Sequence, residues 1–476
     1  MNLRIKYLRI ILKLKRLKLI QKLIDFIKNS YHKALDTNSN LRIQIFQFLP
    51  FFVASTLSGI AAYIYYLIFN FVEKASLHIY EKNNVLIFVL TPVFFLISWW
   101  LVKRYSTYAK GSGIPQVMAA IELSKPETRH LIQKLLSTRI ILIKVLSSIA
   151  KVMGGGITGR EGPTIQISGS IFSTIYKIIP SWWPHISRKN IMVAGAASGL
   201  AAAFNTPLGG IVFAMEELSK YQFKYYKSPL FIAVIIAGLA AQGLGGSYLY
   251  LGYPKLNIEG YQIYLGVIIV GIIAGYSASK MSSLMLILIK FINQLKSDAR
   301  QILIVLISAL VVSSFIYIFG HDAFGSGKEL MEKLLFTNDK HLEWYIPFVR
   351  IISMVSTFSF GGAGGIFAPS LSAGASIGAV ISEIMNLSLN NSNLLILAGM
   401  TAFLTGVTRA PFTSAIIVFE MTDRHSVIFF LMLSAILANI ISNRVDKKSF
   451  YDHIKENYIE DLKNNFPEEK SLKIDK

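Results

Sequence analysis

Gly159-Arg160-Glu161-Gly162-Pro163 opens an apolar stretch, and two other Gly/Pro-rich segments do the same: Gly111-Ser-Gly-Ile-Pro115 and Gly364-Gly-Ile-Phe-Ala-Pro369. Proline suits the first turn of a helix, and glycine lets the backbone approach a ligand closely. The first N–H groups of a helix have no acceptor within it and, with the helix dipole, attract anions. Several such helix starts inside a membrane would form a dehydrated anion site.

The composition around these segments is that of an integral membrane protein. Of 476 residues, 53% are hydrophobic and only 16% are charged, against roughly 25% charged in soluble domains. This excludes a soluble enzyme, a disordered chain and a coiled coil. The net charge is +21, but the basic residues crowd the N-terminus and the ends of apolar segments, as in membrane proteins rather than in nucleic-acid-binding ones.

Residues 1–44 form a basic segment for which we predict an amphipathic interfacial helix on an anionic leaflet. A solvated basic helix is the alternative. Ten basic residues lie in residues 1–33 against one acid, Asp25, which places this end in the cytoplasm and leaves no uncharged core for a signal peptide. The tail, 452–476, is also charged, so both termini should be cytoplasmic and the number of crossings even.

Apolar spans fill the rest of the chain, and several are too short, or too interrupted by Gly and Pro, for the roughly 20 residues of a full crossing. Short, broken spans indicate discontinuous helices that meet at a midplane site. Two long spans, 190–218 and 261–292, are each predicted to be a pair of helices.

An internal repeat divides the membrane region. At an offset of 204 residues, Ala194-Gly195 aligns with Ala398-Gly399, Asn205-Thr-Pro207 with Arg409-Ala-Pro411, and Glu216 with Glu420. The segments that begin at Gly159 and Gly365 match at an offset of 206. We predict a first repeat over 45–250 and a second over 251–451; the sequence leaves parallel and inverted arrangements open.

Glu161 is the strongest candidate for a functional side chain, because ionisable residues inside a membrane are costly. Its carboxylate would compete with an anion for the same N–H groups, and protonation would release it, so one side chain could be both gate and proton acceptor. A structural ion pair with Arg160 is the alternative. Glu216 and Glu217 end an apolar run and could be interfacial, and Arg409 is predicted to be structural or interfacial rather than a ligand.

Other chemistries find little support. Gly325-Ser-Gly-Lys328 lacks the first glycine and the final Ser/Thr of a phosphate loop, and the glycines at 154–159 have no βαβ unit around them. The chain has no cysteine, no His/Glu cluster with metal spacing and no Ser/His/Asp set. We therefore expect no metal, no other cofactor and no enzymatic activity.

The loops closely resemble the signatures of the CLC family of chloride channels and chloride/proton exchangers. The motifs GSGIP (111–115), GREGP (159–163) and GGIFAP (364–369) stand in the family's order, with GLAAAFNTPLGGIVFAMEE (199–217) and KKSFY (447–451) extending the match over roughly 45–455. The resemblance implies an all-α membrane fold of about eighteen helices in two inverted repeats, with helix N-termini converging on a midplane anion site, and a homodimer with one pore per subunit.

The resemblance also implies roles for individual residues. A central chloride site would use the hydroxyls of Ser112 and Tyr451 and the N–H groups of Ile366 and Phe367. An outer site would use backbone groups of Arg160, Glu161 and Gly162, with the Glu161 side chain as gate. Ser112 favours chloride, since nitrate-preferring relatives carry proline there and fluoride exporters alter the motif.

Glu217 resembles the inner proton-transfer glutamate of exchangers, which many channels replace with an apolar residue. This favours proton-coupled chloride antiport over a passive chloride channel gated by voltage or pH. Further alternatives are a fluoride exporter and a membrane enzyme with an intramembrane carboxylate. Gln116 departs from the family pattern, which often has Glu there, and the paired cytosolic regulatory domains of many eukaryotic members are not expected.

Overall fold

The computed structural model describes residues 40–218, 227–246, 250–256, 260–295, 297–422 and 425–467, together with 25, 28 and 29. Throughout these residues the secondary structure is helical, without a β-strand. The predicted all-α membrane fold is confirmed. The predicted interfacial helix over 1–44 lies almost entirely outside the described residues.

The helices fall into two sets, before and after the connection at residues 246–261. The first set comprises α2 (Asn40–Lys82), α3 (Ile87–Tyr105), α4 (Ile114–Glu122), α5 (Ile132–Leu135), α6 (Thr138–Met153), α7 (Glu161–Ile178), α8 (Arg188–Phe204), α9 (Pro207–Phe213) and α10 (Lys227–Gly245). The second comprises α11 (Gln262–Gln294), α12 (Asp298–Phe319), α13 (Lys328–Phe336), α14 (Ile346–Ser359), α15 (Phe367–Ile384), α16 (Leu389–Thr408), α17 (Pro411–Thr422), α18 (Ile428–Val445) and α19 (Phe450–Asn465).

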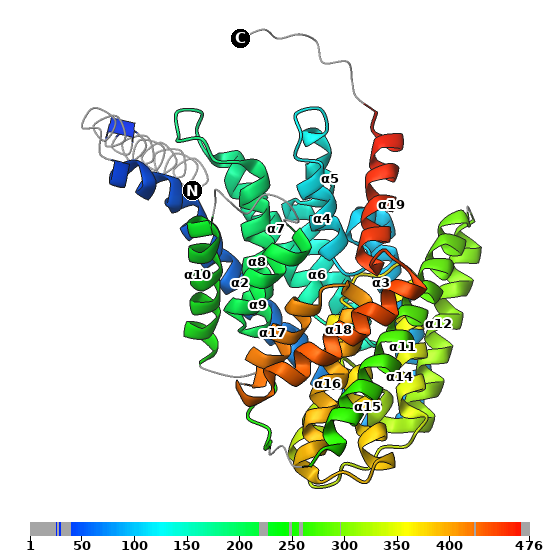
Figure 1. Cartoon of the computed structure of the whole chain (residues 1–476). Coiled ribbons are helices and arrows are strands. Elements are labelled where there is room, and N and C mark those ends of the chain that lie inside the picture. The colour runs from blue at the N-terminus through cyan, green and yellow to red at the C-terminus, as the bar shows by residue number, and fades with distance from the viewer. Residues whose placement is uncertain are drawn as a thin grey trace, which may run out of the picture.

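The surface of this bundle suits lipid. Within the described residues, seven helices are long and apolar enough to cross a membrane, and large apolar side chains such as Phe71 and Phe429 point outward. By contrast, α8 and α16 are short of charge, rich in small residues and almost wholly buried. α2 begins and α19 ends on the same side of the molecule, the top in Figure 1.

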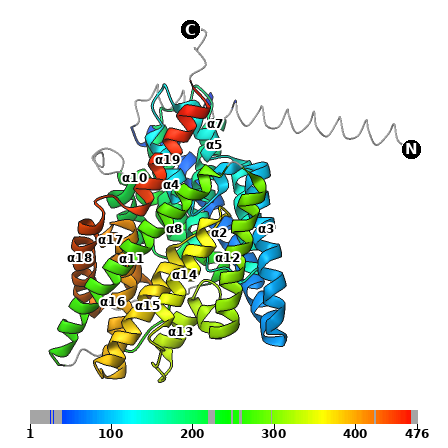
Figure 2. The same cartoon turned by 90° about the vertical axis from the view of Figure 1, so that its right-hand side faces the viewer.

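The two repeats are inverted. In both views α7 lies above the centre of the molecule and α15 below it (Figure 1, Figure 2), and a pair of backbone hydrogen bonds joins the loops that precede them. The C-cap residues of α8 and α16 are Asn205 and Arg409. Both adopt the left-handed conformation, with φ of 57° and 61°. A proline then opens the next helix in each half, as the offset of 204 predicts.

A reciprocal exchange of helix caps joins the halves. The Glu216 carboxylate accepts hydrogen bonds from the N–H groups of Phe412 (3.2 Å) and Thr413 (2.7 Å) at the start of α17. Glu420 accepts from Leu208 N–H (3.0 Å) and Gly209 N–H (2.6 Å) at the start of α9. Each half therefore satisfies otherwise unpaired helix donors of the other.

One prediction about the spans is wrong. Residues 190–218 do divide, into α8, α9 and a π-turn over Ala214–Leu218, but 261–292 forms the single helix α11. Its glycines serve close packing rather than a break: a Cβ at Gly271 would press on Ser434, and one at Gly275 on Ala438, both on α18. Small residues at such contacts let membrane helices approach.

Candidate functional site

Backbone hydrogen bonds join the three Gly/Pro-rich loops at the centre of the molecule. Gly159 and Gly365 exchange N–H···O bonds of 2.8 and 2.9 Å. Gly111 donates to Gly362 O and accepts from Gly364 N–H, both at 3.0 Å. The starts of α4, α7 and α15 therefore meet in one place, as the sequence predicts.

Glycine is required where α4 and α7 approach. Gly113, the N-cap of α4, has φ of +114°, and a Cβ there would meet Gly162 O at 2.5 Å. A Cβ on Gly162 would collide with the Ser112 hydroxyl. This contact sets Ser112 directly against the first turn of α7.

The four residues assigned to a central site lie in buried surroundings. Ser112 and Tyr451 are almost completely buried, and their hydroxyls lie beside each other. Both hydroxyls are among the buried polar atoms that make no hydrogen bond within the described residues. Ile366 and Phe367 are also buried and stand at the start of α15, where the first N–H groups have no acceptor within the helix. The two hydroxyls and the first N–H groups of α15 are therefore available to donate hydrogen bonds to an anion.

The Glu161 carboxylate lies across the starts of both α7 and α15. It is close enough to its own N–H and to that of Ala368 to interact with both, and one of its oxygens lies against Gly159. The other oxygen, Oε1, accepts a 3.4 Å hydrogen bond from the Tyr250 hydroxyl. The carboxylate thus stands where the two positive helix ends meet.

Arg160 and Gly162 flank Glu161 and differ in what they contact. The Arg160 guanidinium lies over the Tyr66 ring, 4.1 Å from its centroid, within electrostatic range of Glu161. Gly162 presents backbone alone to the centre of the site. Both residues are buried.

Glu216 and Glu217 are neighbours in the π-turn of Ala214–Leu218 and point in different directions, as consecutive helical residues do. Such turns re-aim side chains and recur at functional sites. Glu217 is buried and within electrostatic range of Tyr451, whereas Glu216 reaches α17. Arg409, the C-cap of α16, donates to Ser442 O and Asp446 O at the end of α18.

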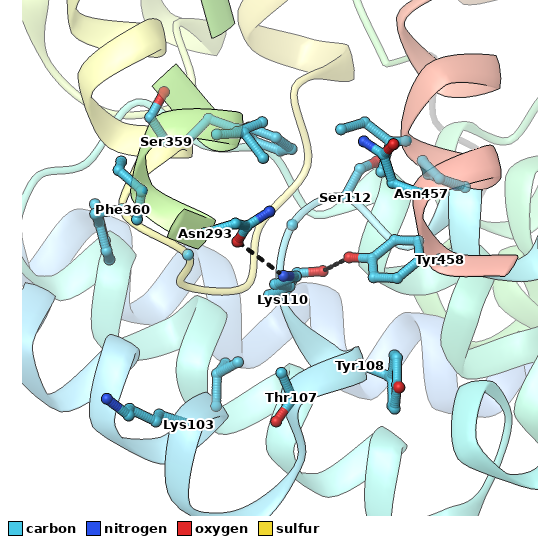
Figure 3. A pocket seen from close by; sticks show the side chains of 18 of the residues that line it. Lys103, Thr107, Tyr108, Lys110, Ser112, Asn293, Ser359, Phe360, Asn457 and Tyr458 are labelled. Carbon is cyan, nitrogen blue, oxygen red and sulfur yellow. Dashed lines mark hydrogen bonds between the residues drawn. The ribbon is translucent and has the colours of Figure 1, made fainter. Parts of the chain in front are cut away.

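A cavity of about 520 Å³ leads to Ser112 from the side where α19 ends. Figure 3 shows Lys103 and Lys110 on its wall together with Ser359, Phe360 and Tyr458. Gln116 also lines it and donates to the carbonyl of Tyr108 (3.2 Å) and to the Tyr458 hydroxyl (3.1 Å). An amide suits this place because a carboxylate would face the carbonyl oxygen without a proton to share.

Sequence reasoning missed three buried groups near the site. Tyr250 stands in a short connection with no motif. Lys144, which donates to Gly111 O at 2.9 Å, and Lys151, whose ammonium lies 4.8 Å from the Phe360 ring centroid, are both fully buried on α6. Two lysines seven residues apart in an apolar span place both charges on one helix face, a signal that the sequence does carry.

The comparisons with known proteins agree with this geometry. The family model described as voltage gated chloride channel matches residues 93–443, well over half of the chain. The H(+)/Cl(−) exchange transporter ClcA of Salmonella paratyphi B is 26% identical over 378 residues, which cover 78% of each chain, and that of Salmonella newport gives the same values.

Solved structures share the fold. A slow cyanobacterial Cl−/H+ antiporter superposes with a TM-score of 0.74 at 20% identity, over 87% of this chain and 98% of that one. A CLC-type fluoride/proton antiporter gives 0.70 at 19% identity, over 87% and 98%. The family and fold predicted from the loop motifs are therefore confirmed.

Proposed function

The chain belongs to the voltage-gated chloride channel family, and on that premise we propose that it transports chloride across a membrane in exchange for protons. Its curated relatives are named as H(+)/Cl(−) exchangers. The observation that carries the proposal is the Glu161 carboxylate seated across the starts of α7 and α15.

Chloride binds at two places in this proposal. In the central site the Ser112 and Tyr451 hydroxyls and the N–H groups of Ile366 and Phe367 replace its hydration. Both hydroxyls are buried without a hydrogen bond, so each has a proton to donate. In the outer site, backbone groups of Arg160, Glu161 and Gly162 bind the anion once the carboxylate has left.

Glu161 then acts as gate and proton acceptor. The ionised carboxylate competes with chloride for the helix-start N–H groups, because both carry one negative charge. Protonation cancels that charge and lets the side chain swing away, so the anion enters as the proton is taken up. Exchange follows because carboxylate and chloride cannot occupy the same donors together.

Glu217 passes protons between the Tyr451 side of the molecule and Glu161. Its burial and its electrostatic contact with Tyr451 support this role. An interfacial carboxylate with no transport role would be expected at an exposed position, where Coulomb interactions are weaker.

The surroundings of the transporter complete the proposal. We place both termini in the cytoplasm from the charge of residues 1–33, with the basic segment on an anionic leaflet. The repeats span 45–250 and 251–451, and two copies form a homodimer with separate pores.

Purified protein in liposomes under a chloride gradient, with a pH electrode outside, tests the function. We expect chloride to drive protons uphill, and Glu161→Gln to pass chloride with proton flux reduced to background. Glu217→Gln should reduce proton flux and keep chloride flux. Chloride flux without any proton signal in the native protein would mean a passive channel, and flux of fluoride alone would mean a fluoride exporter.

A further inference from the structure

Tyr250 lies in the connection between α10 and α11, and its side chain approaches Glu161. Its side chain is 3% exposed, and its hydroxyl lies 3.4 Å from Glu161 Oε1. Tyr250 itself lies outside all of the recognised motifs.

An aromatic chain fixes the position of Tyr250. Its ring meets Phe204 edge-on, with centroids 5.2 Å apart, and Phe204 in turn lies 5.2 Å from Phe367 at the start of α15. Aromatic pairs at this spacing and angle are favourable. The phenol is therefore anchored, through Phe204 at the end of α8, to the start of α15, which is one of the two helix starts beside the Glu161 carboxylate.

Charged groups surround this contact. The Lys328 ammonium lies 5.3 Å and the Arg160 guanidinium 6.0 Å from the Tyr250 ring centroid. The remaining titratable groups within electrostatic range are Glu73, near Tyr250, and the phenols of Tyr65 and Tyr451, near Glu161. The two cations polarise the phenol so that its O–H becomes a better donor to a carboxylate.

We propose that Tyr250 is a positioning residue that holds the ionised Glu161 side chain in its seat across the starts of α7 and α15. The proposal rests on the function assigned to Glu161 above. Tyr250 donates one hydrogen bond to the carboxylate, and that bond must break before the gate can leave.

The effect of removing the Tyr250 hydroxyl depends on which protonation state of Glu161 the hydrogen bond stabilises. The Tyr250 hydroxyl donates to the ionised carboxylate and thereby opposes its protonation. Without this donor, Glu161 is protonated at higher pH and chloride displaces it more easily. A merely structural tyrosine would instead affect thermal stability and leave both properties unchanged.

Tyr250→Phe keeps the ring and removes the hydroxyl. We expect the pH of half-maximal exchange in liposomes to rise by about one unit or less, and the chloride KM to fall a few-fold. Tyr261→Phe, at the other end of the same connection and 92% exposed, is the matched control and should change neither. Melting temperature in detergent checks that each variant is folded.

A double variant separates this proposal from the proposed function. In a Glu161→Gln background, adding Tyr250→Phe should leave chloride flux and its pH profile unchanged, because no carboxylate remains to be held. An unchanged pH profile and KM in Tyr250→Phe alone would overturn the role of Tyr250. Retained proton coupling in Glu161→Gln would overturn the proposed function, whatever Tyr250 does.

Discussion

The starts of α7 and α15 have the same backbone but different side chains. Their N-caps, Arg160 (φ −96°, ψ −14°) and Ile366 (φ −103°, ψ 3°), are nearly superposable in conformation. At the next position, 206 residues apart, α7 carries Glu161 and α15 carries Phe367, both buried. The fold thus supplies two equivalent sets of helix-start donors, and only the start of α7 carries a carboxylate of its own.

The features that stay symmetric hold the two halves together. The Glu216 and Glu420 caps and the paired bonds between Gly159 and Gly365 have equivalent geometry in both directions. In the proposed function, the repeat builds the anion site, and its departure from symmetry at Glu161 provides the route for protons.

The largest effect is expected where the two starts differ in packing. α15 carries Ala368 at the position of Gly162, whereas Gly162 on α7 lies directly against Ser112 of the loop before α4. Gly162→Ala would drive a Cβ into Ser112, costing about 1–3 kcal/mol of stability and displacing the central hydroxyl. We expect chloride affinity measured by calorimetry to fall at least about tenfold, the change that 1.4 kcal/mol produces.

Gly169→Ala on the same helix is the matched control. A Cβ there would meet Val117 at 3.3 Å, far from Ser112, so chloride affinity should be kept. Equal losses of affinity in both variants would mean that glycine loss anywhere in α7 disturbs the site, and the comparison with α15 would fail.

A smaller and symmetric effect is expected from the exchanged caps. Glu216→Ala and Glu420→Ala each leave two helix-start donors unpaired, and each should lower the unfolding free energy by about 1 kcal/mol. Melting temperatures in detergent should fall by similar amounts, with the proton-to-chloride ratio unchanged. A strongly unequal loss would show that the two halves do not support each other equally.

The smallest effect concerns α19, which has no matching helix among the described residues of the first half. Burial raises the pKa of Asp446, but hydrogen bonds from Lys448 N–H and His453 and the Arg409 charge outweigh it and leave the pKa below its ordinary value. A lowered pKa stabilises the fold above the unfolded-state pKa of about 3.9 and loses that contribution as pH falls.

Asp446→Asn tests this contact. At pH 7 the variant should be less stable than the native protein by about 0.5 kcal/mol. The difference should begin to shrink in melting curves recorded below about pH 4 and vanish once the pH is below the lowered pKa of Asp446 in the folded protein. A difference that stayed constant across this range would mean that the carboxylate charge is irrelevant to holding α19.

Much of this molecule could be predicted from its sequence, because the decisive signals are local. Gly, Pro and apolar runs mark the helix starts. The repeat offset of 204 aligns Asn205 with Arg409, and the structure shows both residues in the left-handed conformation. The division of apolar spans into helices was harder to predict. The glycines of α11 indicated a break, because a sequence does not show that another helix will pack on them.

The contacts between distant segments could not be predicted. Tyr250 reaches Glu161 across 89 residues of chain, and Glu216 reaches Thr413 across 197. Neither pair lies in a periodic pattern that would place the two residues together, so only the packed structure shows that the Tyr250 hydroxyl reaches the Glu161 carboxylate and that carboxylates exchange caps.

Anomalous diffraction from crystals grown in bromide tests most directly whether the Glu161 carboxylate takes the place of an anion. We predict bromide at the start of α15, beside Ser112 and Tyr451, in both the native protein and Glu161→Gln. At the start of α7 it should appear only in Glu161→Gln, where the neutral side chain no longer competes. Bromide at the start of α7 in the native protein, with the carboxylate still seated there, would contradict this account.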